Sequence, residues 1–318
     1  MNRAFLALLG GAVVSGLTPL VVRWIEIDPA AAGFWRIVLM LPMLWLWGIR
    51  DGGSRQTSVT ARDRWLLVIG GAAYGADIAV WFWSIELTSA ANAQLFAYCY
   101  PLWVAVAGTL FLNQHLARTG WAAIALGLVG AAFVIAGGGS NLSLADGPKL
   151  LGDGFAILAG LLYSVTMLAQ GTVRSRVGTR RVLLWTTFAA SAVLLPAGFV
   201  SGRDFFPSSI EQWGVMALLG LMTFTAQGLV VYALGRLPVN LAGVAGSLSV
   251  VVAAVGGWAA LGEGLGGWQI FGVAIVLAAV PMAERAVRSR KERPAKESTR
   301  SDAPFSSLAE AREGVAEG

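Results

Sequence analysis

Long apolar runs separated by short polar segments make up most of the chain. A helix of about 20 apolar residues is long enough to cross the hydrocarbon core of a bilayer, which is about 30 Å thick. Runs of about this length recur ten times, and each is as continuously apolar as a transmembrane helix. The sequence therefore predicts an all-α integral membrane protein with ten transmembrane helices, which we place at residues 4–24, 31–49, 65–85, 90–112, 119–138, 152–173, 182–201, 212–234, 238–261 and 267–284.

Positive charge is distributed unevenly between the polar segments. Nineteen of the 23 Lys and Arg residues lie in segments on the side of the N-terminus, and three lie on the opposite side. Cytoplasmic segments of membrane proteins carry such an excess of Lys and Arg. We therefore expect a multi-pass protein of the cytoplasmic (inner) cell membrane, with its N- and C-termini in the cytoplasm.

The ten runs divide into two groups of five with the same spacing, offset by about 147–150 residues. Because five is an odd number, the second group must enter the membrane from the opposite side. The charges agree, since the first connection of the second group (174–181) is basic and that of the first group (23–28) is not. Inverted repeats of this kind are the basis of alternating access around a central site.

This repeat divides the chain into four parts. The segment between the two groups reads as a flexible external connector, and the C-terminal segment is too rich in Arg, Lys, Glu, Ser and Pro to build a core. We place a first five-helix repeat at 1–138, the connector at 139–151, a second, inverted five-helix repeat at 152–285 and a disordered cytoplasmic tail at 286–318.

The composition narrows the possible chemistry. The chain is 56% hydrophobic and 13% charged, with a mean hydropathy of +0.68, whereas globular chains carry about 25% charged residues. Cys99 is the single cysteine and His115 the single histidine, which excludes an internal disulfide and a cysteine-cluster metal site. The net charge of +5 resides in loops and tail, so it does not indicate nucleic-acid binding. We expect no enzyme activity, no metal and no cofactor.

Asp77 is the most informative polar residue of the chain. It lies in the middle of the third apolar run, where a carboxylate costs about 2.5–3.5 kcal/mol on insertion scales and should face protein or water. Tyr74 and Trp81 share its helix face at spacings of three and four residues. Asp77 is a candidate proton carrier or counter-charge for an amine, and the alternative is a structural acid that ties neighbouring helices together.

The fourth run adds further polar and aromatic groups. Gln94, Tyr98 and Pro101 are spaced at i, i+4 and i+7, and Trp103 follows. Pro101 has no N–H, so within a helix it would leave the carbonyl group of Ala97 without its usual partner. Together with the face of Asp77, this segment indicates the lining of a polar pathway, with Gln94, Tyr98 and Trp103 as candidate substrate contacts.

The second half offers counterparts to these residues. Gln227 occupies the position of Asp77 in the repeat, and Tyr163 lies on a polar face of the sixth run. Ser247 and Ser249 follow a stretch of small residues in the ninth run. All four are candidate substrate contacts, and the alternative for each is helix packing through small or hydrogen-bonding side chains.

Two charged residues near the outer membrane edge form a candidate ion pair. Arg36 lies about one turn inside that edge and could extend towards water. Glu86 lies at the outer end of the third run. We expect a structural or gating ion pair between them in preference to substrate contact by Arg36.

Several short motifs carry a resemblance to a known family. They are Gly33–Arg36 at the start of the second helix, Pro101 in the fourth, Leu112–Leu116 after the fourth, and Leu261–Leu265 before Trp268. In these motifs residues 4–284 resemble the EamA-type permeases of the drug/metabolite transporter superfamily. The resemblance implies ten helices in two inverted repeats and export of amino acids, other small metabolites or drugs. It also implies a central cavity lined by helices 1, 3, 4, 6, 8 and 9.

These observations favour a permease that exports a neutral or aromatic amino acid by alternating access. The alternative is a proton-coupled multidrug exporter of lipophilic cations, in which Asp77 would be the dominant contact. An intramembrane enzyme is disfavoured because no nucleophile–base spacing is found, and a receptor-like protein would not need inverted halves. The expected partners are a small-molecule substrate, a proton as candidate coupling ion and the lipid bilayer, with no nucleic acid and no obligate protein partner.

Overall fold

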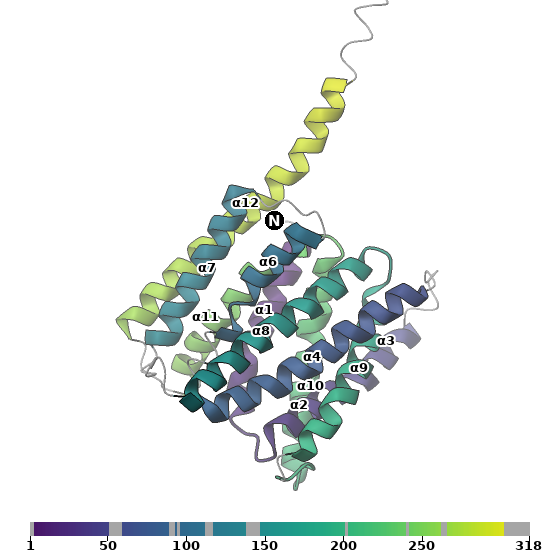
Figure 1. The fold of residues 1–318 in the computed structure, drawn as a ribbon, viewed down its shortest axis with the longest axis vertical. Coiled ribbons are helices and arrows are strands. Elements are labelled where there is room, and N and C mark those ends of the chain that lie inside the picture. Colours follow the sequence, from purple (N-terminus) through teal and green to yellow (C-terminus); the bar gives the residue numbers. More distant parts are fainter. Residues whose placement is uncertain are drawn as a thin grey trace, which may run out of the picture.

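The computed structural model describes residues 3–50, 59–88, 93, 96–111, 117–137, 147–200, 203–239, 242–261 and 266–301, and all regular structure in these ranges is helical. Figure 1 shows the helices as one bundle. The first half contributes α1 (Arg3–Val22), α2 (Pro29–Val38), α3 (Met40–Arg50), α4 (Ala61–Leu87), α6 (Tyr100–Phe111) and α7 (Arg118–Gly137). The second contributes α8 (Gly147–Arg174), α9 (Thr179–Val200), α10 (Ile210–Leu234), α11 (Ala242–Leu261) and α12 (Gly267–Ser301).

Each of the ten predicted spans corresponds to a helix, and the predicted all-α membrane fold is confirmed. Helices α2 and α3 together form one span, Pro29–Ile49. Seven helical stretches of the described residues are long and apolar enough to cross a membrane, and Tyr100–Leu110, Gly246–Ala260 and Gly267–Ala283 are shorter apolar helices. In the fourth span, α6 begins at Tyr100, after a turn at residues 98–99, and the described residues 93, 96 and 97 before this turn are helical.

Helices of one half pack mainly on helices of the other half. Helix α4 packs on α8 and α9, and α10 packs correspondingly on α1 and α2. In the same way α6 packs on α8, α11 packs on α1, and α7 lies beside α12 (Figure 1). Exchanging the first five spans with the second five reproduces these contacts, as expected for two repeats related by a pseudo-two-fold axis.

Glycines allow α4 to approach α9 closely. A Cβ atom at Gly71 would lie 2.5 Å from the carbonyl oxygen of Thr186, and one at Gly75 would lie 2.6 Å from that of Ala190. Only glycine leaves room for such backbone contact, which is a common mode of helix packing in membranes.

The N-terminal turns of α4 and α10 are equivalent in the two repeats. Thr60 caps α4 and its hydroxyl group accepts a hydrogen bond from the backbone N–H of Asp63 at 3.1 Å. Ser209 caps α10 and accepts from the backbone N–H of Gln212 at 3.2 Å. Both pairs are serine/threonine N-caps with the third helical residue as partner.

Asp63 and Gln212 each also bind the connection between the first two spans of the opposite repeat. Asp63 accepts a hydrogen bond of 2.7 Å from Arg176, which lies between α8 and α9. Gln212 donates to the carbonyl oxygen of Trp24 at 3.0 Å and accepts from the N–H of Glu26 at 3.3 Å, between α1 and α2. The repeats therefore interlock at opposite faces of the bundle, by an ion pair at one face and an amide at the other.

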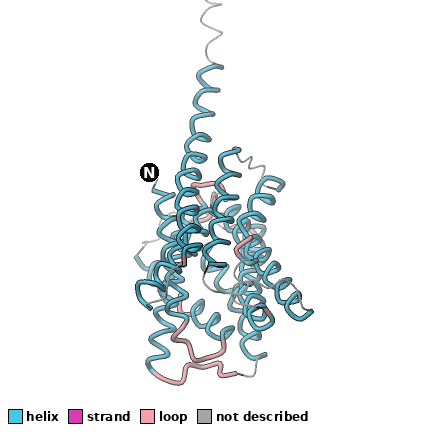
Figure 2. The backbone as a smooth tube through the Cα atoms, turned by 90° about the vertical axis from the view of Figure 1, so that its left-hand side faces the viewer, coloured by secondary structure: helices cyan, strands magenta, loops and turns pink. Residues whose placement is uncertain are grey.

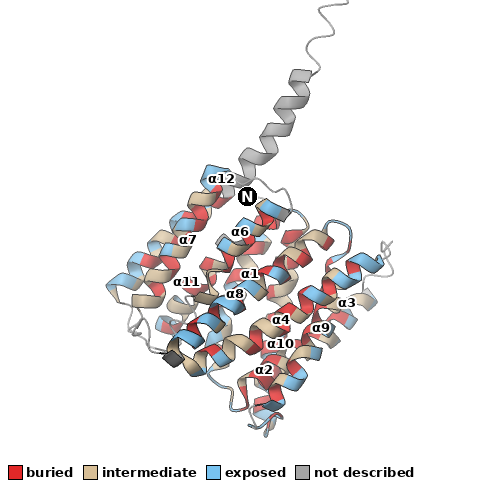
Figure 3. Ribbon diagram, in the orientation of Figure 1, coloured by how far each residue is buried: buried red, intermediate tan, exposed pale blue. Residues whose placement is uncertain are grey.

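The outer surface of the bundle is apolar over much of its length. Figure 3 shows exposed positions along the outward faces of the helices, and large hydrophobic side chains such as Trp45, Leu110 and Phe199 are more than half exposed there. A surface of this kind would be unfavourable in water over so large an area but suits contact with lipid tails.

Helix α12 continues beyond the predicted membrane span. It extends from the bundle to Ser301 (Figure 2), into the segment 286–318 for which the sequence predicts a disordered tail, while 302–318 lie outside the described residues. The reason is that the membrane span has already formed the costly first turn of the helix. The residues after Glu284 are rich in Ala, Arg, Lys and Glu, which extend a helix readily.

Candidate functional site

A central cavity of about 650 Å³ lies between the two repeats. Its lining comes from α1, α2, α4, α6, α7, α8, α10, α11 and α12 and from the turn before α6. The volume falls within the range of roughly 300–1,000 Å³ that is usual for small-molecule sites. The lining includes residues from all six helices that the family resemblance implied.

The cavity extends towards the face of the bundle opposite the two chain ends described here. Val22 at the end of α1, Val134 near the end of α7 and Gln269 at the start of α12 all line it. On the side of the N-terminus, a buried apolar cluster that includes Phe5, Leu8 and Leu234 fills the space between the helices. The cavity is therefore closed by side chains on the terminal side.

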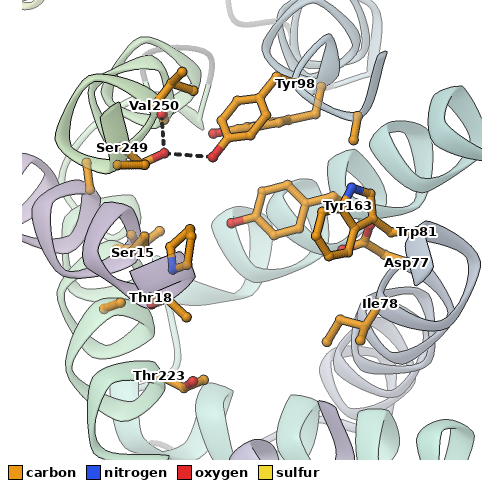
Figure 4. Close-up of a pocket in the computed structure, with 18 of the residues that line it drawn as sticks. Ser15, Thr18, Asp77, Ile78, Trp81, Tyr98, Tyr163, Thr223, Ser249 and Val250 are labelled. Carbon is orange, nitrogen blue, oxygen red and sulfur yellow. Dashed lines mark hydrogen bonds between the residues drawn. The ribbon is translucent and has the colours of Figure 1, made fainter. Parts of the chain in front are cut away.

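Helix α4 carries the predicted acidic face into this cavity. Asp77, Tyr74 and Trp81 all line it, together with Ile78 and Phe82. Figure 4 shows Asp77, Ile78 and Trp81 on α4 facing Ser15 and Thr18 of α1 across open space. The carboxyl group of Asp77 therefore lies deep in the membrane span but faces the cavity rather than lipid.

Four of the five tyrosines of the chain line the cavity. The ring centroids of Tyr74 and Tyr163 lie 6.2 Å apart, those of Tyr163 and Tyr100 4.8 Å, and those of Tyr100 and Tyr98 6.2 Å. The amide nitrogen of Gln227 donates to the Tyr74 hydroxyl group at 3.2 Å. These rings form an aromatic wall with phenol groups that can donate and accept hydrogen bonds.

Ser249 of α11 links this wall to the second repeat. Its hydroxyl group donates to the carbonyl oxygen of Gly246 at 2.6 Å and lies 2.9 Å from the hydroxyl oxygen of Tyr98 (Figure 4). The two hydroxyl groups thus join the turn before α6 to α11.

The structure places three predicted contacts elsewhere or outside its description. Gln94 lies outside the described residues. Ser247 is buried against α7, where its hydroxyl oxygen would lie 2.8 Å from a Cβ at Gly127, and it does not line the cavity. Trp103 is likewise absent from the lining, and its indole N–H is buried without a hydrogen-bond partner.

These corrections follow from helix geometry. Ser247 and Ser249 are two residues apart on α11, which turns their side chains about 200° apart, so one faces α7 and the other the cavity. Because α6 begins at Tyr100, Pro101 occupies its first turn, where a missing N–H costs nothing. The Ala97 carbonyl group therefore precedes the helix, and its oxygen would lie 2.8 Å from a Cβ at Gly160 of α8.

The predicted pair of Arg36 and Glu86 is wrong. Glu86 pairs instead with Arg203, in the connection before α10, at 3.3 Å, and both side chains are more than half exposed. Arg36 lines the central cavity. The connection between α9 and α10 brings Arg203 to the end of α4, whereas α2 directs Arg36 towards the bundle interior, and neither placement follows from sequence spacing.

The structure also brings polar residues to the cavity that the sequence analysis did not select. Gln269 lines it from the first turn of α12, and its side chain accepts a hydrogen bond of 2.9 Å from the N–H of Gly266. Thr223 lines it from α10 and donates to the carbonyl oxygen of Leu219 at 2.8 Å. A lone amide near the start of an apolar run was the available signal for Gln269.

Comparison with known proteins agrees with this architecture. The model of the EamA-like transporter family matches the chain twice, at residues 2–136 and 150–283. An uncharacterized transporter of Vibrio cholerae is 32% identical over 101 residues, which are 30% of this chain and 32% of that protein. The match thus spans about a third of that relative.

A solved crystal structure resembles the fold. It has a TM-score of 0.75 and 20% identity, and the match covers 89% of this chain and 98% of the other. At this identity the likeness concerns the fold alone. The two family matches, one to each repeat, together cover most of the sequence, and the chain is a multi-pass membrane protein that belongs to the EamA-like transporter family.

Proposed function

We propose that the protein is a permease that exports a small amphipathic metabolite, with a neutral or aromatic amino acid as the favoured substrate, by alternating access. The observation that carries this proposal is the central cavity, which is lined by equivalent helices of both repeats. A site on the axis between inverted repeats can be opened to either face by the same motion of one set of helices against the other.

The chemistry of the lining supports an amphipathic substrate. Trp81 and the tyrosine wall offer broad aromatic surface for an apolar side chain, and Ser249, Gln227 and the phenol groups offer hydrogen bonds. Asp77 can take up the ammonium group of the substrate or exchange a proton during the cycle. In both roles a carboxyl group in the membrane interior acts on a charge that crosses the membrane.

The cavity is closed on the side of the chain termini, which supports an outward-facing orientation of the cavity in this structure. If the termini are cytoplasmic, as the distribution of Lys and Arg favours, the cavity is directed outwards and the cluster around Phe5, Leu8 and Leu234 closes the cytoplasmic side. We propose the cytoplasmic (inner) membrane as its location. Opening of this cluster would complete the transport cycle.

Counterflow in proteoliposomes tests the proposed function. Vesicles loaded with unlabelled substrate would be exposed to a panel of labelled amino acids and to one lipophilic cation, with and without a pH gradient. The native protein would be compared with Asp77→Asn, which keeps the size of the side chain but removes its charge. We expect exchange of a neutral or aromatic amino acid by the native protein. The variant should exchange the same amino acid more weakly and should no longer respond to the gradient.

Two results would contradict this expectation. Exchange of the cation alone, lost in Asp77→Asn, would favour the multidrug exporter. Exchange of neither class by native protein that is folded and inserted in both orientations would overturn the proposed substrate class and leave the family assignment intact.

A further inference from the structure

Arg36 and Asp77 are the two charged side chains that line the cavity, among the residues that the structure describes. They come from α2 and α4, which pack against each other. The lining therefore offers one basic and one acidic side chain. A substrate that carries one charge of each sign would meet a complement for both.

The guanidinium group of Arg36 has unused hydrogen-bonding capacity. Its Nε atom is buried and has no hydrogen-bond partner. Buried polar groups in native proteins are nearly always hydrogen-bonded, so an orphan of this kind needs an explanation. Arginine presents its N–H groups in a planar fork that matches the two oxygens of a carboxylate. A carboxylate is thus the ligand that best fits this group.

Asp77 does not form an ion pair with the guanidinium group of Arg36. Arg36 and Asp77 both line the cavity, but the ion pairs of the described residues do not include one between them. Glu86, at the end of α4, pairs with Arg203. An α-amino acid carries its ammonium and carboxylate groups on one carbon atom and can bridge two such charges.

We propose that Arg36 binds the carboxylate of the substrate while Asp77 binds its ammonium group, so that the cavity selects zwitterions. This inference rests on the proposed function and specifies its substrate class. It also separates the two candidate functions, because a lipophilic cation would be attracted by Asp77 but repelled by Arg36 and would leave the Arg36 donors unused.

Competition with modified amino acids tests this proposal. Counterflow of the amino acid that the native protein exchanges best would be inhibited by the same amino acid, by its C-terminal amide and by its N-acetyl derivative. The amide removes the carboxylate charge and the N-acetyl derivative removes the ammonium charge. We expect each modification to weaken inhibition of the native protein at least tenfold.

The variants test whether Arg36 is the residue that binds the carboxylate. In Arg36→Gln the amide should compete as well as the free acid, while discrimination against the N-acetyl derivative persists. Arg36→Lys should restore part of the preference for the acid, because a lysine keeps the charge without the fork. Arg203→Gln is the matched control, since it removes an arginine outside the cavity, and it should retain the native pattern. Only variants with a native-like thermal unfolding midpoint would be compared.

The outcomes distinguish this inference from the function on which it rests. Equal competition by acid and amide in the native protein, a result that needs no variant, would overturn the carboxylate site while amino acid transport stands. Retained preference for the acid in a folded Arg36→Gln would also overturn the assignment to Arg36. Absence of exchange of any amino acid by the native protein would overturn the proposed function and this inference together.

Discussion

The hydroxyl groups of Tyr98 and Ser249 lie 2.9 Å apart and join the two repeats at the wall of the cavity. Tyr98 belongs to the turn before α6, and Ser249 belongs to α11, its equivalent span in the second repeat. Since Ser249 also donates to Gly246, the chain of hydrogen bonds runs from the aromatic wall into the backbone of α11. This contact ties a substrate-lining residue of one repeat to the helix backbone of the other.

Removal of this hydrogen bond should destabilise the protein in a coupled way. Tyr98→Phe and Ser249→Ala should each lower the free energy of unfolding by about 1 kcal/mol, the usual net value of a hydrogen bond. The double variant should lose less than the sum of the two single losses, because both single variants remove the bond between Tyr98 and Ser249. The measurement is a double-mutant cycle from unfolding in detergent. Fully additive losses would contradict a shared bond.

Because α4 packs closely on α9, a larger residue at Gly75 should destabilise the protein, and Gly214 on α10 provides a matched control. In Gly75→Ala the new Cβ atom would lie 2.6 Å from the Ala190 carbonyl oxygen and 2.9 Å from the Val193 Cβ, and such overpacking costs about 1–3 kcal/mol. At Gly214 of α10 no atom lies within 4 Å of an added Cβ, so Gly214→Ala should stabilise the helix by about 0.5–1 kcal/mol.

Unfolding of the two glycine variants, measured under identical conditions, checks this pair. The midpoint of Gly75→Ala should fall and that of Gly214→Ala should stay or rise. A stable Gly75→Ala would show that the helices are not held at the observed separation.

The two ion pairs of the described residues should contribute differently to the free energy of unfolding. Asp63 is buried and accepts hydrogen bonds from Arg176 at 2.7 Å and from the Thr60 hydroxyl group at 2.8 Å. Arg176→Gln should therefore destabilise the protein. The loss should be about 1 kcal/mol, because Arg176 itself is half exposed and its charge is screened by solvent. Glu86 and Arg203 are both largely exposed, and Arg203→Gln should change stability within roughly 0.5 kcal/mol. Comparable losses in both variants would contradict this ranking.

The sequence predicted the helices and the repeats well because each has a simple pattern in the sequence. Ten apolar runs of membrane-spanning length predicted ten helices, and the spacing of the runs with the reversal of loop charge predicted two inverted repeats. Asp77 could be selected because a lone acid in an apolar run must face protein or water. Its helix partners Tyr74 and Trp81 followed from the helical period, and the structure places both at the cavity.

What the sequence could not provide is the rotation of each helix and the meeting of distant ends. Ser247 and Ser249 look equivalent in the sequence, but only Ser249 is turned to the cavity. Pro101 lies at the start of α6 rather than within it. The sequence contains no N-cap signal that would have placed the start of the helix there. The partner of Glu86 depends on the path of the connection between α9 and α10, and Arg36 lines the cavity because α2 directs it towards the bundle interior.

In the proposed function the cavity is the substrate site and opens alternately to the two faces of the membrane. The most direct measurement uses Ala253→Cys, a lining position on α11, in a background in which the native Cys99 is replaced by Ala. Ser247→Cys, on the same helix but buried against α7, is the control. Both would be treated with a membrane-impermeant thiol reagent from each face, with and without the transported amino acid.

We expect Cys at position 253 to react from the face opposite the termini, and the substrate to change its labelling rate several-fold, whereas Cys at 247 should stay unreactive throughout. Reaction from the terminal face should appear under conditions that drive transport. A cysteine at 253 that is inaccessible from both faces in every condition, or whose labelling is indifferent to a transported substrate, would contradict the account.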